Sequence, residues 1–249
     1  MSNIVVHIPH AGLRINKEFI NRIIIDKKEF IKESIYESDF LINLFKPFKH
    51  TVYKSRYSRM LCDVERFKEN EVMDQYGMGI VYEKDSNGNN FISLDNNYTN
   101  TIIKYYDNYH NNFNKLIDNI LNKYGKCLII DLHSFSDEYV YGLFKKKNCK
   151  DICIGVNDDN YSQELLELTI KHFKDNGYIV DINYPYCGTI IPNNHLDIID
   201  NRIISMMIEV NKRVYLDNTY KKLDIMKSIK LKRCLDKLYR IYEEYMNWT

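Results

Sequence analysis

CLIIDLHSF, residues 127–135, is the stretch of sequence that decides the fold. Its first four residues are apolar, which is typical of a buried strand, and polar side chains gather only towards its carboxyl end. Asp131 and His133 are separated by one residue, so in a strand they project from the same face. The stretch therefore predicts a buried strand that delivers polar, chemically active groups to one edge of a sheet.

Other apolar runs with polar boundaries alternate with helical patterns along the rest of the chain. The predicted strands are NIVVHIP (3–9), DICIGV (151–156), GYIVDINY (177–184) and SMMIEVN (205–211), and the predicted helices cover 28–45, 101–124, 163–174 and 221–245. This alternation predicts an α/β fold, with a mainly parallel mixed sheet and helices on both faces. Because no flexible linker or internal repeat interrupts it, residues 1–249 are expected to form a single domain.

Charge and composition exclude several classes of protein. Thirty-five Lys and Arg residues against 34 Asp and Glu residues give a net charge of +1, so no global field favours nucleic acid or an anionic membrane. No basic leader or long apolar segment is present, which predicts a cytoplasmic protein. The six cysteines are scattered without a C-x-x-C pair and are expected to be reduced core thiols. The oligomeric state is left open.

Histidines near the ends of predicted strands are the first candidates for a metal site, because ligands bind beyond the carboxyl ends of strands in such folds. A histidine at a strand end with an aspartate nearby, as in Asp131 and His133, suits a zinc ligand oriented by a second carboxylate. A hydrogen-bonded histidine at the edge of the core is the alternative. His7 lies inside its apolar run and is expected to be packed and hydrogen-bonded, whereas His10 follows the strand and is the expected ligand.

Glu209 lies within an otherwise apolar strand, where a carboxylate is costly to bury without a partner or a metal. It is a candidate general base, and a structural ion pair with an arginine is the alternative. Asn211, which projects to the same side, could orient either arrangement.

The segment SRYSRMLCDVERF (55–67) concentrates arginines around two acids. Its apolar centre, Met60 to Cys62, predicts a strand. Arg59 and Arg66 have the planar donors needed to bind a substrate carboxylate or an oxyanion, although ion pairs on a solvated face are the common reading of such a charge run.

Taken together, these segments resemble the N-formylglutamate amidohydrolase family, whose fold is similar to that of the zinc carboxypeptidases. The likeness runs in order through HIPHAG, ESDFLINLF, SRMLCDVERF, GMGIVY, LIIDLHSF, DICIG, PYCGT and MIEVNKRVYLD. It implies zinc as the cofactor, with His133 and His10 as ligands and Glu209 as the general base. It also implies Arg66 as the anchor for the substrate carboxylate.

Further site residues follow from the same resemblance. Arg59 is expected to stabilise the oxyanion, and contacts with substrate are expected from Ser134, Tyr186, Gly188 and Asn211. The third metal ligand is open, because Leu13 stands where carboxypeptidases have the glutamate of H-x-x-E. Asp39 is the first candidate, followed by Glu37 and Asp63. Glu65 also replaces the asparagine of the carboxypeptidase D-x-N-R segment, which adds a negative charge beside the expected anion site.

The expected activity is zinc-dependent hydrolysis of the amide bond of a small N-acyl amino acid, most simply N-formyl-L-glutamate to L-glutamate and formate. A related zinc peptidase or deacylase with a larger acyl group or a peptide substrate is one alternative. A non-catalytic ligand-binding protein on the same fold is another. A nucleic-acid-binding protein is disfavoured, because neither a basic stripe nor a recognised binding motif is present.

Overall fold

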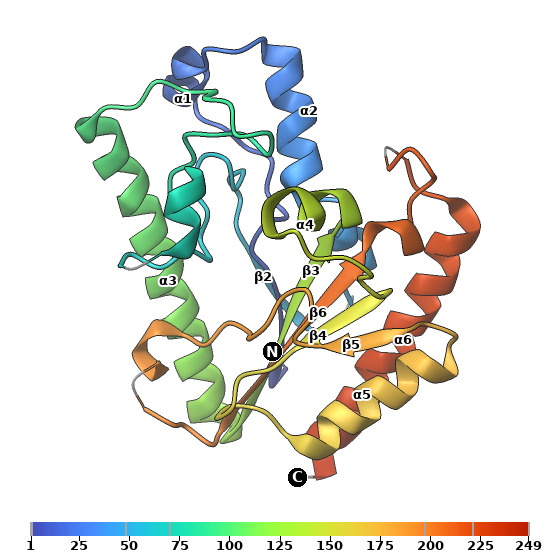
Figure 1. Cartoon of the computed structure of the whole chain (residues 1–249). Coiled ribbons are helices and arrows are strands. Elements are labelled where there is room, and N and C mark those ends of the chain that lie inside the picture. The colour runs from blue at the N-terminus through green and yellow to red at the C-terminus, as the bar shows by residue number, and fades with distance from the viewer. Residues whose placement is uncertain (1, 48, 70, 197, 221, 249) are drawn as a thin grey trace. The chain divides into compact units, whose positions relative to one another are not determined.

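A computed structural model of the protein describes residues 2–47, 49–69, 71–196, 198–220 and 222–248 (Figure 1). Six strands form one sheet in the order β2-β1-β3-β6-β4-β5. Their bounds are β1 (Ile4–Ile8), β2 (Thr51–Lys54), β3 (Cys127–Phe135), β4 (Ile152–Gly155), β5 (Val180–Ile182) and β6 (Ile203–Asn211). The pairs β1·β3, β3·β6 and β4·β5 are parallel, and β4 runs antiparallel to β6. The expected α/β class with a mainly parallel mixed sheet is confirmed.

The chain packs as two compact units. The first comprises Met1–His7, Phe45–Val52 and Leu116–Thr249, and the second comprises Ile8–Leu44 and Tyr53–Lys115. A single domain over the whole chain therefore remains a prediction.

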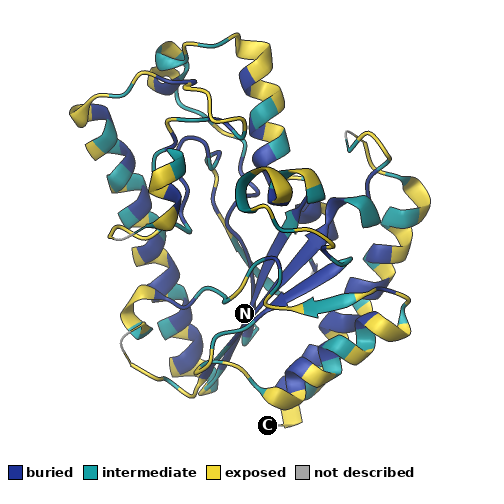
Figure 2. Ribbon diagram, viewed as in Figure 1, coloured by how far each residue is buried: buried dark blue, intermediate teal, exposed yellow. Residues whose placement is uncertain are grey.

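The first unit contains most of the sheet, the last part of α3 (Asn96–Tyr124), and the helices α4 (Asp137–Phe144), α5 (Gln163–Asp175) and α6 (Ile225–Trp248). Single turns of 3-10 helix, Asn193–His195 and Lys212–Val214, precede and follow β6. Nearly every residue of β3 and β6 is buried, as expected of central parallel strands, and Figure 2 shows these strands in dark blue. Helices α5 and α6 pack together through a buried hydrogen bond of 2.9 Å between Thr169 and Tyr242.

The second unit contains α1 (Lys17–Arg22), α2 (Lys27–Glu37), a 3-10 segment (Val72–Tyr76) and the first part of α3 (Asn96–Tyr124). Its core is a cluster of aromatic rings whose neighbouring centroids lie 5.5 to 6.5 Å apart. The cluster consists of Phe19, Phe30, Phe91 and Tyr98.

The predicted helix over 28–45 is wrong in its second half. Helix α2 ends at Glu37, because Ser38 is extended (φ −86°, ψ 160°) and its hydroxyl donates to the carbonyl of Ile35. A 3-10 turn, Ile42–Phe45, follows. Phe30 is buried as expected, but Ile35 is 46% exposed, and so is Ile31 at 53%. The apolar face of this helix is therefore narrower than the sequence pattern indicated.

The predicted strand around Met60 is also wrong. The carbonyl of Ser58 accepts hydrogen bonds from the amides of Leu61 and Cys62, at 3.0 and 3.1 Å, which folds the segment into a turn. Burial alone made this segment look like a strand, since Met60 and Leu61 are fully buried.

The remaining predicted elements form, with shifted bounds. Helix α3 begins at Asn96, five residues before the predicted start, and α6 begins at Ile225. Strand β2 and helix α4 were not predicted, because β2 is short and only half-buried and α4 has eight residues. All six cysteines are described, and none forms a disulfide; Cys187 is exposed and the other five are buried. Among the described residues, no helix combines the length and the apolar character needed to cross a membrane.

Candidate functional site

In the first unit, β1, β3 and β6 carry polar side chains on one face of the sheet near their carboxyl ends. His7 is paired with Asp131 between β1 and β3, and His133 is paired with Glu209 between β3 and β6. Paired residues of neighbouring strands project to the same face, and so do Asp131 and His133, which are two positions apart. The register therefore gathers two imidazoles and two carboxylates on one face.

The carboxylate of Asp131 holds both imidazoles. Its Oδ1 lies 2.7 Å from Nδ1 of His7 and 3.0 Å from Nε2 of His133, and its Oδ2 accepts a hydrogen bond of 3.3 Å from the amide of Ile190. Burial opposes ionisation of Asp131, but His133 and His7 outweigh it and hold the pKa of this carboxyl well below its usual range. His7 is packed and hydrogen-bonded as predicted. Because Nε2 of His133 faces Asp131, Nδ1 is the atom through which this imidazole could bind a metal.

Glu209 lies between two neighbours across the sheet, His133 on β3 and Cys153 on β4. Glu209 is buried, with only 7% of its surface exposed. Burial, followed by the negative charge of Glu209, raises the pKa of the Cys153 thiol to about 12. A thiol with this pKa stays protonated at neutral pH, so Cys153 is not a nucleophile.

Asn211 is fully buried and its side chain is bonded within the protein. Its Nδ2 donates to Oδ1 of Asp137 at 3.1 Å, and its Oδ1 accepts from the amide of Arg213 at 3.1 Å. Arg213 in turn donates to Asp137 at 2.6 Å. The amide that we expected to contact substrate thus fastens the end of β6 to the start of α4. Ser134 is not gathered with His133 either, because strand alternation directs its side chain to the opposite face.

The loop of residues 183–190 lies over the face that carries His133. The ring of Tyr186 packs edge-on against Phe135, two positions from His133, and the centroids are 5.9 Å apart. The carbonyl of Tyr186 accepts a hydrogen bond of 3.2 Å from Cys153. The loop also contains Gly188, so both loop residues expected to contact substrate lie in one segment beside the site.

In the second unit, His10 lies between two carboxylates. Its Nε2 is 2.9 Å from Oδ1 of Asp63, and its Nδ1 is 3.3 Å from Oδ2 of Asp39. Burial and Arg59 lower the pKa of His10, but Asp63, Glu65 and Asp39 together outweigh them, so the pKa is raised. An imidazole that donates from Nε2 to Asp63 presents Nδ1 beside Asp39, so this nitrogen and this carboxylate are the atoms that could bind a metal here.

Asp63 is the centre of this second cluster. It is completely buried, and its Oδ2 lies 2.7 Å from Nη2 of Arg59, 3.3 Å from Nη2 of Arg66 and 2.9 Å from the hydroxyl of Tyr82. Burial opposes ionisation, but Arg59, Arg66 and His10 hold its pKa well below the usual range. The sequence predicted Asp63 as a possible third metal ligand and, alternatively, as an ion-pair partner of the neighbouring arginines. The signal for its role was its spacing, four residues after Arg59 and three before Arg66.

The two arginines are thus held by ion pairs with Asp63, and Nε of Arg66 also donates to the carbonyl of Met78 at 3.0 Å. These contacts fix the orientation of both guanidinium groups inside the unit. Asp39 is buried beside His10, and Glu37 is also buried. Of the three candidate ligands, Asp39 is the one whose oxygen lies beside Nδ1 of His10, the imidazole nitrogen that does not face Asp63.

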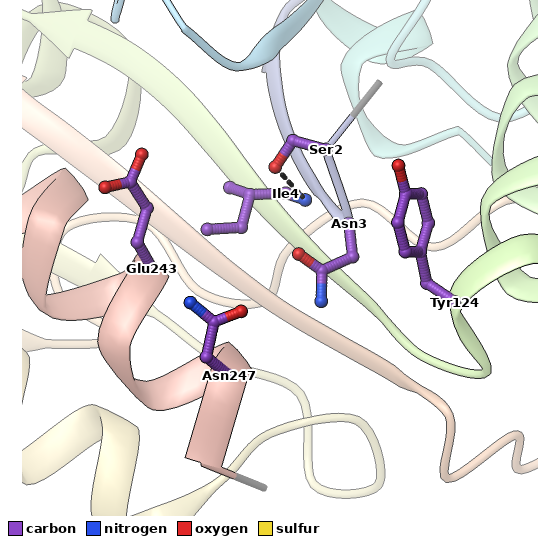
Figure 3. Close-up of a pocket in the computed structure, with 6 residues that line it drawn as sticks. All are labelled: Ser2, Asn3, Ile4, Tyr124, Glu243 and Asn247. Carbon is purple, nitrogen blue, oxygen red and sulfur yellow. Dashed lines mark hydrogen bonds between the residues drawn. The ribbon is translucent and has the colours of Figure 1, made fainter.

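A separate pocket of about 320 Å³ lies at the other end of β1 (Figure 3). Figure 3 shows Glu243 and Asn247, one turn apart on α6, beside the start of β1. The pocket is lined by Ser2, Asn3, Ile4, Tyr124, Glu243 and Asn247. These residues lie at the amino end of β1, away from His7, so this pocket does not belong to the candidate site.

Comparison with known proteins agrees with this architecture. A family model described as N-formylglutamate amidohydrolase matches residues 2–216. The crystal structure of N-formylglutamate amidohydrolase from Ralstonia eutropha JMP134 is similar, with a TM-score of 0.82 and 17% identity over 98% of this chain and 94% of that one. The crystal structure of gene product Atu2144 from Agrobacterium tumefaciens has a TM-score of 0.67 and 16% identity over 97% of this chain and 92% of that one.

No curated protein sequence matches the chain. At these identities the two solved structures bear on the fold, whereas the family model matches most of the sequence itself. The chain therefore belongs to the N-formylglutamate amidohydrolase family.

Proposed function

We propose that this protein is a zinc-dependent amidohydrolase that converts N-formyl-L-glutamate and water into L-glutamate and formate. The observation that carries the proposal is the pairing of Glu209 with His133 on one buried sheet face, beside the carboxylate that holds His133. The family assignment supplies the substrate class.

The residues present suit a zinc ion by their chemistry. We infer that His10, Asp39 and His133 are the ligands, because two imidazoles and a carboxylate are donors that zinc prefers. Asp63 and Asp131 hold these imidazoles and would orient them, as second carboxylates do at zinc sites. When bound, zinc supplies Lewis-acid polarisation and lowers the pKa of water towards about 7.

The reaction needs one group that moves protons. Glu209 takes a proton from the attacking water, whose oxygen forms a bond to the formyl carbon, and delivers it to the leaving nitrogen as the carbon–nitrogen bond breaks. A carboxylate inside an apolar strand suits this task, because few competing waters reach it. The products are formate and a free amine.

The arginines supply positive charge for the anionic substrate. Arg59 stabilises the oxygen that becomes negative during attack, and Arg66 pairs with a substrate carboxylate. Both guanidinium groups are already oriented by Asp63, so binding does not have to order two flexible side chains.

Substrate profiling separates this function from a related deacylase. Glu65 lies 3.4 Å from His10 and adds a carboxylate to the cluster, so the charge of the substrate is the property to vary. Hydrolysis should therefore be compared for N-formyl-L-glutamate, N-acetyl-L-glutamate and N-formyl-L-glutamine.

The deciding experiment measures metal content and amine release on the same purified protein. We expect stoichiometric zinc, hydrolysis of N-formyl-L-glutamate, loss of activity with a chelator and recovery on adding zinc. A protein that holds no zinc and gains no activity from it would refute the metal proposal. A zinc-loaded protein that prefers the acetylated or the uncharged substrate would refute the assignment of N-formyl-L-glutamate.

A further inference from the structure

The loop of residues 183–190 is attached to its surroundings by a side chain that takes the place of a neighbouring strand. The side chain of Asn157, which follows β4, makes both hydrogen bonds that a neighbouring strand would make to Thr189. Its Oδ1 accepts from the Thr189 amide at 3.1 Å, and its Nδ2 donates to the Thr189 carbonyl at 3.0 Å. One side-chain amide thus satisfies the backbone of a loop residue completely.

The loop also rests directly on the backbone of β4. A Cβ atom added at Gly155 would lie 2.2 Å from the carbonyl oxygen of Gly188, so only glycine fits beneath the loop. Gly188 itself has φ +79°, a left-handed conformation that favours glycine. The close approach to β4 therefore requires glycine at position 155, and the left-handed turn of the loop favours glycine at position 188.

Beyond Thr189 the loop reaches the catalytic face. The Thr189 hydroxyl lies 2.9 Å from that of Ser205, and the next residue, Ile190, donates its amide to Asp131 at 3.3 Å. Asp131 is the residue that holds His133. The position of Thr189 is thus linked through hydrogen bonds to the group that orients the candidate ligand.

From this geometry we propose that Asn157 is a positioning residue, which fixes the loop of residues 183–190 as a preformed wall of the substrate site. Asn157 acts through the Thr189 backbone and does not itself contact substrate. The wall that it fixes includes Tyr186 and Gly188. This inference rests on the proposed function for its substrate, but the ordering of the loop can be measured without any substrate.

Asn157→Ala removes both hydrogen bonds to Thr189. We expect KM for N-formyl-L-glutamate to rise about tenfold, the effect of losing one or two net hydrogen bonds that order the loop, with kcat changed less than about threefold. Asn157→Asp keeps the acceptor for the Thr189 amide and should restore part of the affinity. Asn160→Ala is the matched control, because Asn160 also donates its side-chain amide to backbone carbonyls, those of Asp200 and Ile203.

A second pair of variants perturbs the same loop without touching Asn157. Gly155→Ala places a methyl group against the Gly188 carbonyl and against the side chain of Met207, and should reproduce the rise in KM. Gly142→Ala is its control, since a Cβ atom there meets nothing within 4 Å.

Amide hydrogen exchange of residues 184–190 supplies the readout that needs no substrate. Faster exchange in Asn157→Ala and Gly155→Ala, with unchanged exchange in both controls, together with the selective rise in KM, is the expected result. Wild-type exchange and wild-type KM in Asn157→Ala would overturn the inference, as would an equal rise in KM in Asn160→Ala. An inactive wild-type protein would instead refute the proposed function, and exchange would still decide whether Asn157 orders the loop.

Discussion

Glu209 and His133 are direct partners in the ladder between β3 and β6, so their side chains leave the same face of the sheet next to each other. Asp131 lies two positions before His133, and its carboxylate accepts a hydrogen bond from the His133 imidazole. A buried carboxylate and an oriented imidazole are thus placed by strand register alone, which is more rigid than placement by a loop.

Replacing Glu209 with Gln keeps the size of the side chain and removes its basic carboxylate. Turnover of N-formyl-L-glutamate should fall by at least about 10²-fold, the lower range for losing a general base. Thermal melting and zinc content should stay at wild-type values, and Glu164→Gln on the exposed start of α5 is the control. Near-normal turnover in the Glu209 variant would assign the base to another acid.

Asp131→Asn tests whether this carboxylate orients His133. We expect zinc affinity to fall by about 10- to 100-fold, as is typical when the partner of a ligating histidine is lost, in competition with a chelator of known affinity. Asp118→Asn is the control, because Asp118 makes a 3.0 Å contact with His195 away from the site. Equal zinc affinities in wild type and Asp131→Asn would show that the contact with His133 is only structural.

Conservative changes separate the roles of the two arginines while keeping a positive charge near Asp63. Arg66→Lys should raise KM for N-formyl-L-glutamate about tenfold, because lysine cannot bind a carboxylate bidentately. Arg59→Lys should mainly lower kcat. Arg22→Lys, in an ion pair with Asp95, should change neither value. If Arg66→Lys raised KM equally for N-formyl-L-glutamate and for its diamide, which has no carboxylate, Arg66 would not be the anchor for a substrate carboxylate.

The carboxylate of Asp200 should make part of the free energy of unfolding depend on pH. Hydrogen bonding to Arg202 is the largest cause that lowers the pKa of this carboxyl to about 2. Since the folded pKa is below the unfolded value of about 3.9, the charged carboxylate stabilises the fold above pH 4, and this contribution disappears as the pH falls towards 2. In urea unfolding, Asp200→Asn should be less stable than wild type at pH 7, and the difference should shrink between about pH 4 and pH 2. A difference that is constant with pH would contradict this.

The corrected face of α2 can be tested with two neighbouring substitutions. Phe30 packs against Phe19 and Phe91, so Phe30→Ala should lower the free energy of unfolding by about 3 to 5 kcal/mol. Ile31 is 53% exposed, so Ile31→Ala should lower the free energy of unfolding by less than about 0.5 kcal/mol. Equal losses of unfolding free energy from the two substitutions would show that the buried face of α2 includes both Phe30 and Ile31.

The buried central strands could be predicted from the sequence because short, continuous apolar runs with polar boundaries are typical of such strands. The alternation in CLIIDLHSF also placed Asp131 beside His133 correctly, since side-chain direction in a strand follows position alone. The same reasoning failed around Met60. There the buried residues belong to a turn that is stabilised by hydrogen bonds to the Ser58 carbonyl. The spacing of apolar residues in the sequence cannot distinguish such a buried turn from a buried strand.

The cluster around Asp63 was only partly predictable. Arginines at both sides of Asp63 indicated ion pairs, but their common partner emerges only when the turn brings Arg59, Arg66 and Tyr82 to one carboxylate. The role of Asn157 had no sequence signal, because its partner Thr189 is 32 residues away and the contact is to backbone.

The distribution of thiols makes the native chain suitable for fluorescence spectroscopy. Burial shields five cysteines and raises the pKa of Cys127 and Cys234 to about 12, whereas Cys187 is exposed in the loop next to Gly188. A maleimide dye should therefore label Cys187 selectively, without any engineered cysteine, since modification needs an accessible thiolate. Its emission anisotropy would report the motion of this loop in real time while ligand is added.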